Sequence, residues 1–230
     1  MVFKGYINLY VDSIRMICLY VNEYNYGGIC KKEKNFQEYE RNMPKYMINC
    51  IGCVSHKLSI ILLKMFSDDH NNKEWDIMSI SDIDELYVPS IDVSSTNYVN
   101  EQKEQKIGFY DGPFFFLPYC YVYKCIVGVK GDDNIHSFFP NENKDFLIHK
   151  NEFVAFDYNR DAHYVYKTEN NNDETDYTMV IEDGLCQEDT CIMLKIHYII
   201  FPKFLPIFIV NIYKKLHIWI DTAKWVFKNL

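Results

Sequence analysis

The sequence predicts a mainly β protein: an antiparallel jelly roll with helices at its N-terminus and an amphipathic helix at its C-terminus. Three observations predict it. From Trp75 onward, short runs rich in Val, Ile, Tyr and Phe alternate with clusters of Asp, Asn, Gly and Pro. Before that point apolar residues recur at helical intervals, and after Pro206 polar residues do the same. One domain is expected, because a chain of 230 residues with 48% hydrophobic residues can bury a substantial core.

The N-terminal part, residues 1–74, is expected to be helical. Residues 6–21 form a first amphipathic helix, in which Asp12 and Arg15 interrupt the apolar positions and which ends before Gly27. A charged surface stretch at residues 31–42 leads into a second helix from Tyr46 to Phe66.

The middle part, residues 75–201, is expected to form the jelly-roll core. Its strand-like runs include "YVYKCIVGV", "NIHSFF", "EFVAFDY", "HYVYK" and "CIMLKIHYIIF". Turn residues separate them at 131–134, 141–144 and 170–173. Six or more short antiparallel strands at this spacing are typical of a jelly roll or a sandwich.

The C-terminal part, residues 202–230, is expected to be an amphipathic helix. Its uninterrupted apolar run is shorter than the roughly 20 residues that a membrane span needs. Two readings of it stay open. The helix packs against the sheet with its lysines in water, or it lies on a membrane surface through Trp219 and Trp225.

Composition and charge exclude some classes of function. The net charge of −8 and the absence of a long basic run argue against nucleic-acid binding. Asp12 and Arg15 break the N-terminal apolar stretch, so it lacks a signal-peptide core, and a cytoplasmic location with free thiols is expected. Cys50 and Cys53 form a CxxC without the second pair that a structural zinc site needs.

The stretch "EFVAFDYNRDAHYVY", from Glu152 to Tyr166, carries the candidate site. A strand, a turn and a returning strand would place His163 at the mouth of a barrel, where jelly-roll proteins hold iron. The alternative is that His163 is a structural imidazole that hydrogen-bonds Asp157 or Asp161.

The region from Tyr119 to Pro202 resembles the aspartyl/asparaginyl β-hydroxylase-like 2-oxoglutarate dioxygenases. The pieces that carry the resemblance are "KCIVGV", Lys124 to Val129, and "KNEFVAFDYNRDAH", Lys150 to His163. They correspond to a glycine-bearing strand followed by a strand, a turn and a histidine. The resemblance covers about a third of the chain and implies a double-stranded β-helix that uses Fe(II) and 2-oxoglutarate.

The same resemblance implies roles for individual residues. His163 would be the distal iron ligand, and His136 is the nearest substitute for the first ligand, because Cys125 stands where that ligand would align and no HxD or HxE occurs. Asp157 would orient the ligand histidine. The family holds its cosubstrate with an arginine on the strand after the distal histidine; here Arg160 and Lys167 are the cations close in sequence.

Two functions from different classes follow. The first is an iron-dependent, 2-oxoglutarate-type hydroxylase acting on an unidentified substrate, with His163 and His136 as metal ligands. The second is a non-catalytic jelly-roll protein that binds a partner protein or a membrane surface through its C-terminal helix.

Overall fold

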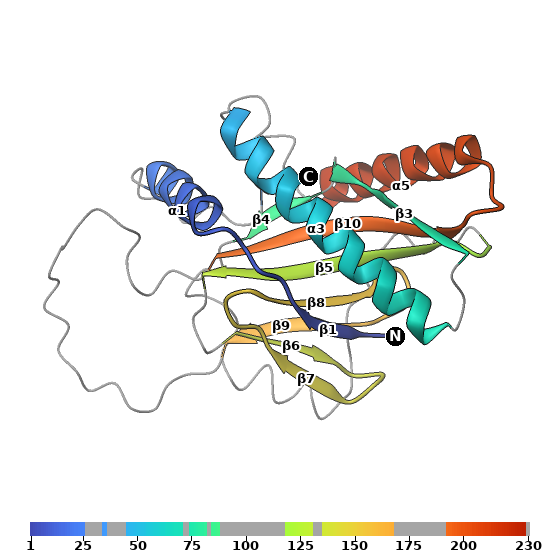
Figure 1. Cartoon of the computed structure of the whole chain (residues 1–230), viewed down its shortest axis with the longest axis horizontal. Helices are drawn as coiled ribbons and strands as arrows, with labels where there is room; N and C mark the ends of the chain where they lie inside the picture. Colours follow the sequence, from blue (N-terminus) through green and yellow to red (C-terminus); the bar gives the residue numbers. More distant parts are fainter. Residues whose placement is uncertain are drawn as a thin grey trace, which may run out of the picture.

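The computed structural model describes residues 1–25, 34–35, 45–70, 74–81, 84–87, 118–130, 135–167 and 192–228. Within these residues, two antiparallel sheets and three helices form an arrangement of the β-sandwich type (Figure 1). The prediction of antiparallel sheets with added helices is confirmed at this level, while the jelly-roll topology stays a prediction.

The larger sheet has seven strands, and its centre is formed by the two longest, β5 and β10. All its pairings are antiparallel. Its strands run in the order β1 (Phe3–Tyr6), β8 (Glu152–Asp157), β5 (Tyr121–Lys130), β10 (Ile192–Pro202), β4 (Glu85–Tyr87) and β2 (Lys34–Asn35), and β3 (Trp75–Ser79) also pairs with β10. Every residue of β10 is buried, so this strand has neighbours on both faces of the sheet.

The smaller sheet has three strands, and it lies below the larger one in Figure 1. Their order is β7 (Lys144–Leu147), β6 (Ile135–Phe139) and β9 (Tyr164–Lys167).

Two helices, α1 (Val11–Asn25) and α3 (Lys45–Asp69), cover one face of the larger sheet (Figure 1). Side chains at helical spacing along α3 are fully or almost fully buried against β5, β8 and β10: Ile51, Val54, Leu58, Leu62 and Phe66. Among the described helices, α3 from Ile48 to Asp69 is the one long and apolar enough to cross a membrane. One side of it, the buried stripe, packs against the sheet.

The other face of the larger sheet carries two separate apolar clusters. The first joins the sheet to β6, β7 and the turns beside them, and contains Val2, Ile126, Phe139, Ile148, Val154, Phe156 and Met193. The second joins it to α5 (Ile207–Lys228), and contains Ile80, Cys120, Val122, Tyr158, Ile199, Phe201, Val210 and Tyr213. The space between the two clusters is where the sheet carries polar side chains.

The N-terminal part differs from the expectation of helices alone. The first helix begins at Val11, and residues 3–6 instead form β1, which pairs with β8 so that Phe3 lies opposite Ala155. Gly5 suits this edge strand because a Cβ at its position would lie 2.7 Å from the ring of Phe153. Four residues are too short a run for periodicity to reveal.

Candidate functional site

A buried polar band, formed by Lys124, Lys195 and His197, crosses the middle of the larger sheet between the two apolar clusters. Each of these residues is at most 6% exposed. Lys124 lies on β5 between Val122 and Ile126 of the same face, and Lys195 and His197 lie on β10. His197 is directly opposite Lys124 in the register of the two strands. The band therefore places two ammonium groups and an imidazole on one buried face.

Aromatic side chains border the band on the side of α5. The ammonium of Lys124 lies 5.3 Å from the centroid of the Tyr158 ring, within range of a cation–π contact. The same ring lies 5.1 Å from His197 and 5.6 Å from His217 on α5. Tyr158 thus connects the band to the C-terminal helix.

Asp84 brings a carboxylate to the band from the segment between β3 and β4. One of its oxygens accepts a hydrogen bond of 2.7 Å from the backbone N–H of His197, and it also lies 3.4 Å from Nδ1 of that ring. The backbone N–H of Ile80 donates to the carbonyl of His197 at 2.8 Å. Residue 197 falls between the stretches of β10 that pair with β3 and with β4. The backbone N–H of His197 therefore has Asp84 as its hydrogen-bond partner, and its carbonyl has the N–H of Ile80.

His163 lies directly before β9, near the start of the returning strand as predicted, and it is buried against aromatic rings. Its ring stacks at 5.9 Å on Phe139 and lies 4.2 Å from Phe156. Phe156 belongs to the cluster between the two sheets. His163 therefore faces the interior of the sandwich.

His136 lies on β6 and points away from His163. Phe138 pairs with Tyr164, so Phe139 and His163 are neighbours on one face of the smaller sheet, as their stacked rings show. Because side chains alternate along a strand, His136 points to the opposite face. There its Nδ1 lies 3.3 Å from Asp145. The structure does not bring the two histidines together, so they cannot share one ion.

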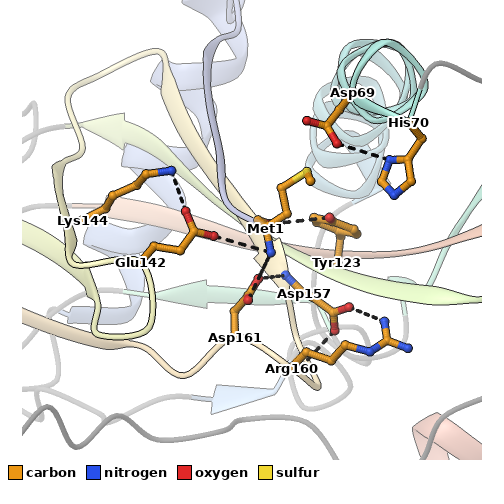
Figure 2. Close-up of polar contacts among 9 residues, drawn as sticks. All are labelled: Met1, Asp69, His70, Tyr123, Glu142, Lys144, Asp157, Arg160 and Asp161. Carbon is orange, nitrogen blue, oxygen red and sulfur yellow. Dashed lines mark hydrogen bonds and ion pairs between the residues drawn. The ribbon is translucent and has the colours of Figure 1, made fainter.

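Asp157 and Arg160 pair with each other (Figure 2). Nη1 of Arg160 donates to Oδ2 of Asp157 at 2.6 Å, and Oδ1 accepts hydrogen bonds from the backbone N–H groups of Asn159 and Arg160. Burial raises the pKa of Asp157, while the nearby guanidinium opposes this shift. Asp157 lies opposite Tyr123, whose ring faces the helices rather than the polar band. Asp157 and Arg160 thus close the turn after β8.

The neighbouring Asp161 accepts hydrogen bonds from the backbone N–H of Asp157, at 2.8 Å, and from the amino group of Met1, at 3.0 and 3.2 Å (Figure 2). Lys167, the other predicted cosubstrate residue, ends β9 opposite Ile135, and its side chain lies outside the described part of the chain.

The described residues do not fit an iron centre. Among them, no three His, Cys, Asp or Glu side chains lie together in a way that could hold a metal ion. A non-haem iron site needs at least two imidazoles on one face, often with a carboxylate. His163 lies between phenylalanine rings, and His136 points to the other face of its sheet.

Lys124 and Lys195 were not predicted from the sequence, although the sequence carries a signal for them. Each is the single charged side chain inside an otherwise apolar strand, in "YVYKCIVGV" and "CIMLKIHYIIF". A lysine in the middle of a fully buried strand is rare unless an anion is near, because burying an unpaired charge is costly. That pattern could have directed attention to these strands rather than to the turn at Asp157.

Comparisons with known proteins place the chain in no family. No family profile matches it, and no curated protein matches it. One solved structure that is similar is a truncated form of the viral collagen prolyl hydroxylase from Paramecium bursaria Chlorella virus 1. It has 13% sequence identity and a TM-score of 0.43 over 87% of this chain and 90% of that chain. A likeness this distant carries no argument about activity.

Proposed function

We propose that the polar band binds a small organic dianion of the 2-oxoglutarate class, and that the chain is a 2-oxoglutarate-type hydroxylase of jelly-roll fold. The observation that supports this proposal is the pair of buried lysines, Lys124 and Lys195, on neighbouring strands of one interior face. Two ammonium groups in a region of low dielectric attract a carboxylate far more strongly than they would at the surface.

The position of Lys195 supports the cosubstrate part of the proposal. The resemblance to the β-hydroxylase family implies a cation on the strand that follows the distal histidine. In this chain the next described strand after β9 is β10, where Lys195 is buried. Arg160 precedes the histidine and already pairs with Asp157. Lys195 therefore takes over the role that the sequence suggested for Arg160 or Lys167.

Other residues of the band would orient the ligand. A carboxylate between Lys124 and Lys195 would also face the ring of His197, which Asp84 holds in place. Tyr158 would close one side of the site with its ring. The described residues do not fit iron, so the roles of Lys124, Lys195 and His197 are to bind and orient the cosubstrate.

Calorimetric titration with 2-oxoglutarate tests the binding. We expect Lys195→Met to weaken binding at least tenfold, and Lys195→Arg to restore part of it because the charge returns. Lys57→Met is the matched control, since Lys57 is a half-buried lysine on α3, the helix on the other face of the sheet, and it donates to the carbonyl of Asn8. Equal affinities of the folded wild-type protein and Lys195→Met would contradict the proposal.

Iron-dependent release of succinate from 2-oxoglutarate tests the hydroxylase activity. We expect Lys195→Met to abolish it, because the cosubstrate is no longer held, and His136→Ala, on the other face of the smaller sheet, to leave it unchanged. If 2-oxoglutarate binds but no succinate forms at any Fe(II) concentration, the chain is a carboxylate-binding protein without this activity.

A further inference from the structure

The outward side of α5 carries an exposed apolar stripe, formed by Phe204, Phe208, Ile212, Leu216 and Trp219. The spacing of four, four, four and three residues places these side chains in one line along the helix and the turn before it. They are between 41% and 73% exposed. The opposite side of the helix is buried on the sheet through Val210 and Tyr213.

The stripe continues beyond the helix. Tyr119, which is 68% exposed, lies before β5, and its ring packs edge-on at 6.4 Å against Phe204. Exposed apolar residues scattered singly need no explanation, whereas a contiguous patch of large ones marks an interaction site. Figure 1 shows α5 on the outside of the molecule, away from the smaller sheet.

The charge of this segment differs from that of the rest of the chain. Residues 203–228 contain five lysines and one aspartate, whereas the whole chain has a net charge of −8. Lys203 and Lys215 are exposed beside the stripe. A basic, apolar face on an acidic protein is complementary to an anionic surface that has an apolar interior, and repulsion of the remaining surface favours contact through this face alone.

We propose that α5 docks onto an anionic lipid bilayer. The helix lies in the plane of the membrane, with the apolar stripe at the boundary between headgroups and acyl chains and the lysines among the headgroups. Trp219, which is 69% exposed, suits this boundary because its ring is apolar with one polar N–H. The helix does not span the bilayer, because its other side is part of the protein core.

Sedimentation with vesicles tests the docking on the full chain. Vesicles of phosphatidylcholine with about 30% phosphatidylserine, an anionic lipid, are compared with vesicles of pure phosphatidylcholine. We expect at least tenfold stronger binding to the anionic vesicles, and a loss of at least tenfold in the double variant Phe208→Ser/Trp219→Ser. Ile60→Ser on the outer side of α3 is the matched control, since Ile60 is also an exposed apolar residue on a helix.

Two further measurements make the proposal falsifiable. Tryptophan emission should shift to the blue with anionic vesicles, and Trp219→Phe should remove that shift. Equal binding to both kinds of vesicle, or no effect of the double variant, would overturn the proposal. A concentration-dependent dimer that the double variant dissociates would assign the stripe to a second copy of this chain instead. None of these outcomes depends on whether 2-oxoglutarate binds.

Discussion

The helices α3 and α5 pack on opposite faces of the same sheet, yet they place their apolar side chains differently. In α3 the apolar stripe from Ile51 to Phe66 faces the sheet and is buried. In α5 the apolar stripe from Phe204 to Trp219 faces solvent, and other side chains, including Val210 and Tyr213, make the contact with the sheet. The comparison shows that apolar periodicity identifies a helix but does not tell which apolar face the core uses.

The two helices should therefore contribute unequally to stability. Fully burying a large apolar side chain contributes about 1.5–3 kcal/mol, and α3 has five such positions on the sheet. The exposed residues of α5 contribute little to folding, so they are free to serve binding. Three predictions test this difference.

The largest effect is expected for Phe66→Ala. Phe66 is fully buried and contacts the rings of Trp75, Tyr121 and Tyr123 at 5.1 to 5.8 Å. Truncation should lower the free energy of unfolding by about 3–5 kcal/mol, because it removes this packing and leaves a cavity. The matched variant on the other helix, Phe208→Ala, should change it by less than about 0.5 kcal/mol. Urea unfolding measures the free energy of unfolding of both variants. Similar losses in the two would contradict the unequal contribution of α3 and α5 to stability.

The second effect is expected in thiol reactivity. Cys125 lies in the core under α3, and Cys120 lies in the cluster under α5. Burial raises the pKa of Cys120 to about 11 and that of Cys125 well above its usual value of 9.0. If α5 opens more easily than α3, iodoacetamide at pH 8 should label Cys120 about tenfold faster, a difference of about 1.4 kcal/mol in opening free energy.

The pH dependence of that experiment has a definite sign. The thiol of Cys120 keeps its proton more tightly in the folded protein than in the unfolded chain. Its contribution to stability is therefore complete below pH 9 and is lost as the pH rises toward 11. Labelling should accelerate with pH across this window. Peptide mapping by mass spectrometry measures the labelling of both cysteines in one sample. Faster labelling of Cys125 than of Cys120 would mean that α3 opens more easily than α5, which would contradict the prediction.

The smallest effect is expected for Tyr198→Phe. The hydroxyl of Tyr198 on β10 donates to the carbonyl of Ser55 on α3 at 2.7 Å, and burial keeps the phenol protonated by raising its pKa. Removing this bond should cost about 0.5–1.5 kcal/mol. The control Lys214→Met removes the bond from α5 to Ser79 and should cost less, because that lysine is only half-buried. Thermal unfolding of the two variants at the same pH measures the difference, and an equal or larger loss in Lys214→Met would contradict the prediction.

Much of the fold could be predicted from local pattern. The strands from Tyr121 to Phe139 and from Glu152 to Lys167 appear where alternating or continuous apolar runs between turn residues indicate them. Cys120 and Cys125 lie in clusters on opposite faces of the sheet, as the period of two of a strand requires for positions five apart. The position of His163 directly before β9 follows from the same reasoning.

The candidate site could be predicted only in part. Sequence proximity drew attention to Asp157 and Arg160, which turn out to pair with each other. The buried lysines of β5 and β10 lie 71 positions apart in the chain. They become neighbours only when the two strands pair, and no local pattern shows which strands do so.

By itself, the sequence determined the kind of each main element, because side-chain periodicity and turn residues act over a few neighbouring positions. It also determined that the C-terminal helix is amphipathic and basic. Only the tertiary structure decided which faces meet: that His136 and His163 point to opposite sides of a strand pair, that Lys124 and Lys195 share an interior face, and that α5 turns Phe208 and Trp219 to solvent. The reason is physical, since contacts between distant segments depend on strand order and packing, which no short stretch of the chain specifies.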